Sequence, residues 1–407
     1  MSPRLSDRAI AGLDRADVPE YLLEHVARTT SPDPQVRDSY TCLAVAENKL
    51  MWDLLATKAN TVRHVGPAAF GYAEHWGSAP LREAISEFGS ANLWHEAIDP
   101  EAIVMMAGAG ATLEATFAAL CNPGQGVLIP TPSYAGYWLD IETRIGLRGV
   151  PVATSPDVDF RLTEKNLDDA LRSSPVSVGA LLLTNPPNPT GHILGNDELT
   201  TAVAWARRHG LHIVVNEIYG LSTYGETPFT SITTLVDRGD DLHLIWGFSK
   251  DFAASGLRCG LLLSNNVELI AAVRNQAMFS VVSGDTQHLF VTMLTDPGWL
   301  DGYVGEMRRR LRASYLATTE VLDNHDIPFI RADAGLFVFA DLRSALTNQT
   351  WEREHDVWRR ILNETGVNVT PGSACRAPGP GFMRICFATV PRPVISQALD
   401  TALSAVR

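Results

Sequence analysis

The sequence predicts an α/β fold in which helices cover a mostly parallel central sheet, with a second, smaller α/β domain. Apolar runs alternate with helical patterns, and these runs are IVMMA (103–107), GVLIP (126–130), VGALLL (178–183) and LHIVV (211–215). Runs of this length are typical of parallel strands that are buried on both faces. In the last hundred residues, shorter strand patterns alternate with helices, which predicts the smaller domain; these patterns are GLFVFADL (335–342) and MRICFA (383–388).

The order of these patterns predicts how the chain is divided. A helical pattern at 19–27 belongs to an N-terminal arm, residues 1–44, that joins the small domain. Residues 45–285 are expected to form the large domain and residues 286–407 the small one. Three further helices are expected at 198–209, 267–279 and 300–323, because their apolar residues recur at helical spacing.

Composition excludes several classes of protein. The 407 residues carry 46 acidic and 33 basic side chains, a net charge of -13, and the basic residues are spread along the chain. This pattern argues against nucleic-acid and anionic-membrane partners. The five cysteines show neither close pairing nor metal-ligand spacing, and no apolar run is long enough to span a bilayer. We therefore expect free thiols, no bound metal and a cytoplasmic protein.

The strongest chemical signal is the stretch GFSKDFAASGLRCG (247–260). It places Lys250 after Ser249 and eight residues before Arg258. A lysine at the end of a strand can form a Schiff base with an aldehyde, and a nearby fixed cation can hold that aldehyde's phosphate, which is what pyridoxal phosphate requires. Taken alone, a Ser-Lys pair is more often an ordinary surface feature.

A second stretch, GAGATLEA (108–115), places Gly108, Ala109 and Gly110 between a predicted strand and a predicted helix. Backbone N–H groups and the helix dipole favour an anion at such a junction. A tight turn that merely requires glycine is an equally good interpretation.

Other polar residues follow the predicted strands. Tyr134, Asn188, Asn216 and Tyr219 all lie where a strand ends, so the topology predicts that they cluster with Lys250 at one edge of the sheet. A ring at Tyr134 could stack on a planar ligand, although a tyrosine packed in the core or at its rim is the alternative.

Two charged residues stand in unusual contexts. Arg384 interrupts an apolar strand, where an arginine usually has a buried anionic partner in the protein or in a ligand. Glu47 precedes a helical pattern in AVAENKL (44–50). A helix cap or a solvated carboxylate is the favoured interpretation of Glu47 without further context.

With Lys250, NPPNPTG (185–191), NEIYG (216–220) and Arg384, the chain resembles the fold-type-I pyridoxal phosphate enzymes of the aminotransferase class I/II superfamily. The resemblance runs from about residue 40 to residue 390. It implies that Lys250 binds the cofactor covalently and that Asn188 and Tyr219 hold its 3-oxygen, with Tyr219 also in a catalytic role. It implies further that Tyr134 stacks on the ring and that Arg384 pairs with the substrate carboxylate. The phosphate would be held by Gly108, Ala109, Gly110, Ser249 and Arg258.

Within that superfamily the chain looks most like the 1-aminocyclopropane-1-carboxylate (ACC) synthase group. The similar stretches include AENKL (46–50), GSAPLREAISEF (77–88) and PGSACRAPGPGFMRICFA (371–388). That group handles S-adenosylmethionine, which would form an external aldimine and lose methylthioadenosine from its γ-carbon. Cyclisation would follow, or capture by a second substrate such as a nicotinamide nucleotide in natural-product biosynthesis. Glu47 would face the sulfonium cation.

Three departures from the family pattern bear on function. Gly247 stands three residues before Lys250, where many members have a serine, so one phosphate hydroxyl is expected to be missing. Asn216 stands where the superfamily usually has an aspartate facing the pyridine nitrogen, and an amide cannot supply a negative charge. The tyrosine that in ACC synthases reaches a neighbouring subunit's phosphate is missing near His75 and Trp76, or is replaced by Tyr72. By resemblance we expect a homodimer with shared sites, to which Tyr72 contributes.

Four functions are compatible with these residues. The favoured one is the γ-carbon chemistry on S-adenosylmethionine. An ordinary aminotransferase is the alternative, although a neutral Asn216 disfavours it. A pyridoxal phosphate-binding regulator would need a basic DNA-binding module, which the sequence lacks. A catalytically silent member of the family is motivated by Asn216 alone.

Overall fold

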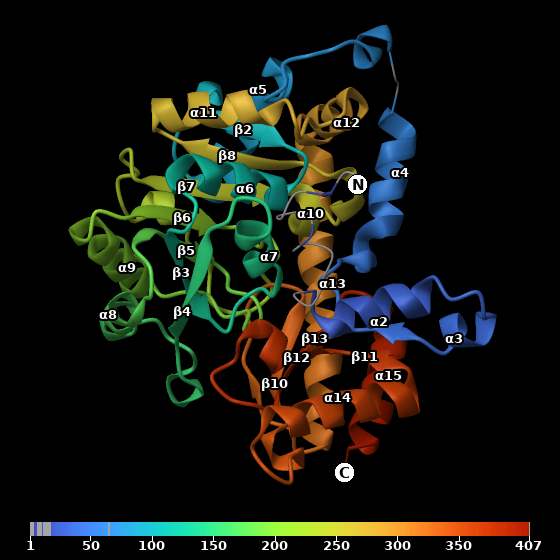
Figure 1. Ribbon diagram of the computed structural model, residues 1–407. Coiled ribbons are helices and arrows are strands. Elements are labelled where there is room, and N and C mark those ends of the chain that lie inside the picture. Colours follow the sequence, from blue (N-terminus) through green and yellow to red (C-terminus); the bar gives the residue numbers. More distant parts are fainter. Residues whose placement is uncertain (1–3, 6–9, 11–17, 64–65, 407) are drawn as a thin grey trace.

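A computed structural model describes residues 4–5, 10, 18–63 and 66–406 (Figure 1). Its main feature is a seven-stranded sheet with the order β2-β8-β7-β6-β5-β3-β4. Strand β8 runs antiparallel to both of its neighbours, and the remaining pairs are parallel. The predicted mostly parallel sheet is therefore confirmed. The strands are β2 (Ile103–Met106), β3 (Gly126–Thr131), β4 (Arg148–Ala153), β5 (Val178–Thr184), β6 (His212–Asn216), β7 (Leu242–Gly247) and β8 (Gly260–Ser264).

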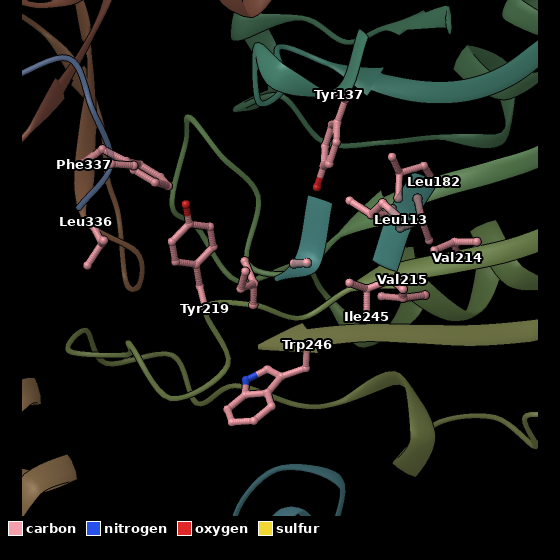
Figure 2. Packing of buried hydrophobic residues seen from close by; sticks show 14 of the residues in the cluster. Leu113, Tyr137, Leu182, Val214, Val215, Tyr219, Ile245, Trp246, Leu336 and Phe337 are labelled. Atoms are coloured by element: carbon pink, nitrogen blue, oxygen red, sulfur yellow. The ribbon is translucent and has the colours of Figure 1, made fainter. Parts of the chain in front are cut away.

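Helices cover the sheet on both sides. In Figure 1, α8 (Glu164–Ser173) and α9 (Asn196–Arg208) lie on one side, and α6 (Ala109–Leu120) and α7 (Gly136–Glu142) lie on the other. Helix α9, predicted at 198–209, buries Leu199, Ala202, Val203 and Ala206, which recur at the spacing of one helical face. Leu113 of α6 packs beside Leu182, Val214 and Ile245 of the strands (Figure 2). This apolar packing fixes the edge of the sheet where the polar residues gather.

A smaller, antiparallel sheet follows in the chain, with the order β12-β13-β10-β9. Its strands are β9 (Phe329–Ile330), β10 (Phe337–Asp341), β12 (Thr370–Pro371) and β13 (Phe382–Cys386), and its accompanying helices are α13 (Pro297–Asn324), α14 (Trp351–Thr365) and α15 (Arg392–Ser404). The helix expected at 300–323 is α13. The division of the chain at residues 44 and 285 stays a prediction.

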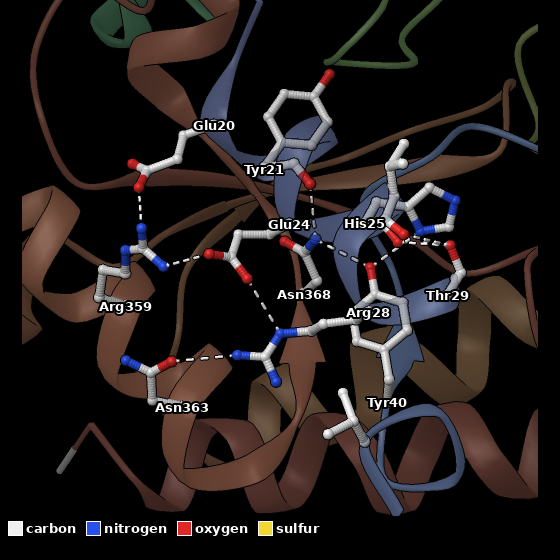
Figure 3. A network of polar contacts seen from close by, with 12 residues as sticks. Glu20, Tyr21, Glu24, His25, Arg28, Thr29, Tyr40, Arg359, Asn363 and Asn368 are labelled. Carbon is white, nitrogen blue, oxygen red and sulfur yellow. Dashed lines mark hydrogen bonds and ion pairs between the residues drawn. The ribbon is translucent and has the colours of Figure 1, made fainter. Parts of the chain in front are cut away.

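The described part of the predicted N-terminal arm contacts the smaller sheet, because the backbone N–H of Cys386 in β13 donates to the carbonyl oxygen of Leu43. Strand β1 (Thr41–Cys42) pairs in parallel with β11 (Val367–Asn368). Helix α2 (Glu20–Thr29) is fixed to α14 by ionic contacts: Arg359 contacts Glu20 and donates to Glu24 at 2.7 Å (Figure 3). Residues 1–3, 6–9 and 11–17 of the arm lie outside the described residues.

The remaining α-helices lie between these elements in the chain. They are α3 (Pro34–Asp38), α4 (Trp52–Val62), α5 (Ala79–Gly89), α10 (Phe248–Asp251), α11 (Val267–Ala277) and α12 (Gly284–Leu294). No helix in the described part of the chain is long and apolar enough to cross a membrane. The five cysteines are free thiols, as expected.

Candidate active site

A cavity of about 360 Å³ opens where the strands of the large sheet end. Its walls come from both sheets and from α2, α6 and α7. The predicted residues that line it are Ala109, Gly110, Tyr134, Asn188, Asn216, Tyr219, Ser249, Lys250, Arg258 and Arg384. Residues from distant parts of the sequence thus meet in one place, as the topology predicted.

Lys250 lies in α10, directly after β7, and its side chain enters the cavity. Nζ donates to the carbonyl oxygen of Ala46 at 2.5 Å. Burial lowers the pKa of Lys250 to about 8, because the charged amine loses its hydration. Among the described residues that line the cavity, Lys250 is the sole lysine. A buried amine that is partly neutral near physiological pH is suited to nucleophilic attack and to proton transfer.

Asp251, which sequence reasoning missed, holds α10 in place. Its carboxylate accepts hydrogen bonds from the backbone of Leu221 and Ser222 and from Trp246 Nε1, at 3.1, 3.0 and 2.9 Å. These bonds tie the turn that carries Lys250 to the loop that follows Tyr219. The only signal in the sequence was a carboxylate next to the lysine, which is too common a pattern to carry the prediction.

The N-terminus of α6 and Arg258 form an anion cradle. Gly108 has φ +93°, and a Cβ at this position would lie 2.3 Å from a guanidinium nitrogen of Arg258. Only glycine leaves room for that cation beside the free N–H groups of α6. Arg258 itself is held by the carbonyl oxygen of Ser255 at 2.8 Å. Ser255, a second residue that sequence reasoning missed, also lines the cavity with Ser249.

Gly247 stands where many family members have a serine, and the structure gives a reason for the glycine. A Cβ at Gly247 would lie 2.9 Å from the carbonyl oxygen of Cys259 and 3.1 Å from the Cα atom of Gly260. Strands β7 and β8 therefore approach too closely here for a side chain without a backbone shift. The phosphate hydroxyl that a serine would supply is lost for a packing reason.

Three polar side chains form a chain of hydrogen bonds across the cavity. Asn188 Nδ2 donates to the hydroxyl oxygen of Tyr219 at 3.3 Å, and Arg384 donates to Asn188 Oδ1 at 3.0 Å. The ring of Tyr219 meets Phe337 of β10 edge-on, with a centroid distance of 5.4 Å (Figure 2). Asn188, Tyr219 and Arg384 are thus aligned by contacts between the two sheets.

Arg384 is 1% exposed, yet it forms no ion pair with any described residue. Its guanidinium donates to neutral oxygens: Thr370 Oγ1 at 2.9 Å, Asn188 Oδ1 and the carbonyl oxygen of Ala44. A buried cation without a counter-charge is costly unless a ligand supplies one. We therefore expect a ligand to supply the anionic partner of Arg384.

Asn216 is held in a fixed orientation at the end of β6. Its Nδ2 donates to the hydroxyl oxygen of Tyr137 at 2.9 Å, and its Oδ1 accepts from the backbone N–H of Ile218 at 3.2 Å. Tyr137 in turn lies 2.7 Å from Thr184 Oγ1. Tyr137 and Thr184 also line the cavity, and no sequence motif marks either residue. The amide supplies N–H donors but no negative charge at this wall.

Two predicted substrate residues do not line the cavity. Glu47 is half-buried and forms an ion pair with Lys49, at 3.4 Å between Oε2 and Nζ, near the cavity's edge. Tyr72 is fully exposed and does not reach the cavity of its own chain. The prediction that Tyr72 serves a neighbouring subunit's site stays a prediction.

Two further residues in the cavity wall were not predicted. Tyr21 of α2 covers the cavity from the side of the small sheet, and Asp140 of α7 lines the wall beside Gly110. Burial raises the pKa of Asp140 to about 6. Asp140 is the sole carboxylate in the described lining. The other charged residues there are the cations Lys250, Arg258 and Arg384.

Pyridoxal phosphate fits these groups. The cradle of Gly108 and Arg258 suits a phosphate, Lys250 suits the aldehyde, and the hydroxyl of Tyr219 with the amide of Asn188 suits the ring oxygen. The described residues contain no cluster of side chains that could hold a metal ion.

The chain is similar to known proteins. The family described as aminotransferase class I and II matches residues 41–401. ACC synthase 6 of Arabidopsis thaliana is 32% identical over 382 residues, which are 89% of this chain and 77% of that protein. The ACC synthase of Malus domestica is 30% identical over 88% of this chain and 80% of its own length.

Among solved structures, the aspartate aminotransferase of Thermus thermophilus with maleate has a TM-score of 0.83 at 22% identity, covering 99% of this chain and 100% of that one. This likeness shows the fold, which is that of the fold-type-I enzymes. The chain belongs to the aminotransferase class I and II family of pyridoxal phosphate-dependent enzymes and is a relative of the ACC synthases.

Proposed function

We propose that this enzyme binds S-adenosylmethionine and acts at its γ-carbon, releasing methylthioadenosine. One observation carries the proposal: Lys250 and the unpaired Arg384 share a cavity in a chain that is similar to ACC synthases over 89% of its length. The remaining substrate fragment either cyclises or is captured by a second substrate, for which a nicotinamide nucleotide is one candidate.

The described residues divide the work as follows. Pyridoxal phosphate, when bound, withdraws electrons from the α-carbon of an amino acid. The guanidinium of Arg384 pairs with the substrate carboxylate and thereby orients the α-carbon toward Lys250. The amine of Lys250, once neutral, accepts the proton from that carbon. Tyr219 and Asn188 would hold the ring oxygen, Tyr134 would contact the ring, and the cradle of Gly108 and Arg258 would hold the phosphate.

The alternative function is amino-group transfer, which the fold shared with aspartate aminotransferase favours. Asn216 argues against it. The amide donates to Tyr137 and cannot stabilise a protonated pyridine nitrogen by charge. Conversion of the bound cofactor to its amino form by common amino acids, without methylthioadenosine release, would decide for this alternative.

The first test assays methylthioadenosine release from S-adenosylmethionine by the cofactor-loaded protein and by a Glu47→Gln variant. We expect the parent to release methylthioadenosine, and the variant to show a KM for S-adenosylmethionine about five- to tenfold higher. The reason is that one partly screened charge pair contributes on the order of 1 kcal/mol. Glu47 would exchange its contact with Lys49 for the sulfonium.

S-adenosylhomocysteine supplies the matched control, because it keeps the adenosyl group and lacks the positive charge. Its inhibition constant should be the same for the parent and for Glu47→Gln. If the variant handles S-adenosylmethionine as well as the parent does, Glu47 has no part in recognising the sulfonium. If the parent releases no methylthioadenosine, the γ-carbon proposal fails as a whole.

The lowered pKa of Lys250 predicts a pH dependence for cofactor uptake. Only the neutral amine attacks an aldehyde, so the rate at which apoprotein captures pyridoxal phosphate should rise about tenfold per pH unit below the pKa of about 8 and level off above it. Stopped-flow absorbance from about pH 6 to about pH 10 measures this rate. Pyridoxal, which lacks the phosphate, should show the same midpoint. A rate that still climbs steeply above pH 9 or so would mean that the lysine has its ordinary pKa.

We further propose that the enzyme is a homodimer in which Tyr72 reaches the neighbouring subunit's cofactor. Support comes from the full exposure of Tyr72 and the 81% exposure of Phe70, two aromatic side chains that one copy of the chain leaves in solvent. A monomeric mass by light scattering at full cofactor occupancy would refute the dimer.

A further inference from the structure

A second cavity of about 520 Å³ adjoins the first. The two cavities share four lining residues, which are Pro19, Tyr21, Ala135 and Leu139. Four separate parts of the fold build the second cavity: the start of α2, the edge of the large sheet at α7 and β4, one face of α14, and the segment 371–376 beside the small sheet. A molecule bound in the second cavity would therefore lie directly beside the substrate of the first.

The carboxylates of this second cavity are already engaged. Glu20 contacts Arg359 and lies 2.8 Å from His355 Nε2 (Figure 3 shows the contact with Arg359). Glu142 Oε1 accepts a hydrogen bond from the backbone N–H of Gly149 at 2.9 Å. Glu20 is thus paired with a cation, whereas Glu142 is held by a neutral N–H group and keeps its negative charge.

The arginines of the same cavity have no such partners. Neither Arg148, at the start of β4, nor Arg376 takes part in an ion pair with any described residue. Both side chains line the same cavity. The protein has a net charge of -13, and other arginines, such as Arg28, Arg63 and Arg310, form ion pairs with carboxylates. Because Glu20 is paired with Arg359, the two guanidinium groups face one further carboxylate, Glu142, whose charge acts on Arg376. The cavity keeps an excess of one positive charge, which a ligand can meet.

Arg376 is held in position by an aromatic ring. Its guanidinium lies 3.5 Å from the ring centroid of Trp138, which is 7% exposed. A Cβ at Gly149 would lie 2.1 Å from the Trp138 ring, so the glycine makes room for this stack. Partial burial lowers the pKa of Arg376. A guanidinium that is ordered before binding loses less conformational entropy when it captures an anion.

We propose that the second cavity binds an anionic co-substrate, carrying phosphate or carboxylate groups, next to the amino-acid site. Arg148 and Arg376 hold its anionic end, and its other end reaches past Tyr21 and Ala135 into the first cavity. This inference rests on the proposed function in one respect: that function supplies the reaction in which the bound molecule would take part. The binding itself needs no turnover.

The test is calorimetric titration of the cofactor-loaded protein with inorganic pyrophosphate and, separately, with citrate. Pyrophosphate represents a phosphate ligand and citrate a carboxylate ligand, so the tighter of the two identifies the source of the charge. We expect saturable binding of at least one anion, weakened by added salt. Arg148→Gln and Arg376→Gln should each weaken it about tenfold, which is the loss of one charge-assisted contact.

Arg172→Gln is the matched control, because Arg172 is an exposed arginine on α8 that pairs with Asp169 and lies outside both cavities. It should leave the affinity unchanged, and all variants should retain the absorbance of the bound cofactor. Absence of binding by both anions overturns the proposal, as does binding that survives both cavity substitutions. If the protein binds pyrophosphate but releases no methylthioadenosine, the second site is supported and the proposed function is refuted. If it releases methylthioadenosine but binds neither anion, the proposed function is supported and the second site is refuted.

Discussion

Lys250→Ala is expected to lower turnover by about 10⁴-fold or more, whichever amino acid the enzyme accepts. The substitution removes the only lysine among the described residues of the cavity wall, and with it both the nucleophile for the aldehyde and the proton acceptor at the α-carbon. The visible absorbance of the covalently bound cofactor should disappear as well. Steady-state kinetics and absorbance spectra of the purified variant measure the two effects.

Lys250→Arg separates charge from chemistry. It keeps a cation near the carbonyl oxygen of Ala46, but its guanidinium stays protonated and cannot act as a nucleophile. It should be as inactive as Lys250→Ala. Added methylamine should restore part of the activity of the alanine variant, because a small amine can occupy the vacated space and accept the proton. If Lys250→Ala keeps more than a tenth of the parent's turnover, another group accepts the proton from the α-carbon.

The second large effect is expected for Arg384→Gln. Loss of the charged, two-pronged donor should raise the KM for the amino-acid substrate about 100-fold, because charge-assisted hydrogen bonds contribute roughly 1.5 to 3 kcal/mol each. The effect should be the same for S-adenosylmethionine and for an ordinary amino acid, since both carry the α-carboxylate. The comparison of KM values for these two substrates checks it.

Arg384→Lys is the conservative control. It keeps the positive charge but loses the planar fork that also reaches Asn188 and Thr370, so its KM should fall between those of the parent and of Arg384→Gln. Urea unfolding should show that Arg384→Gln lowers the free energy of unfolding by about 1 to 3 kcal/mol, because buried oxygens lose their hydrogen-bond donors. A KM that changes less than threefold in Arg384→Gln would mean that the substrate carboxylate binds elsewhere.

The residues that meet at the cavity could be predicted because their positions follow from topology. Parallel strands end at one edge of a sheet, so Asn188, Asn216, Tyr219 and Lys250, each at or just after the end of a strand, had to gather there. These signals are local or repeat with the secondary structure. For Gly108 the sequence left an anion site and a tight turn as equal interpretations, and only the structure showed that a Cβ there would meet Arg258.

Other features depend on contacts between distant segments, which no local pattern encodes. Asp251 matters because its carboxylate happens to face the backbone at 221–222, and Tyr137 matters because its hydroxyl meets Asn216. The exposure of Tyr72 likewise emerged only from the folded chain. None of these partners is recognisable from residue type alone.

The sequence by itself determined the α/β fold, the cofactor and the family, because strand periodicity and the spaced motifs around Lys250 and Arg384 are properties of the chain's order. Only the tertiary structure decided that Arg384 has no counter-charge among the described residues, and that a second cavity with two unpaired arginines adjoins the first. The physical reason is that the net charge at a site depends on all the residues that folding brings to it. Whether a buried cation is paired depends on every segment that packs around it, and packing brings together residues that lie hundreds of positions apart.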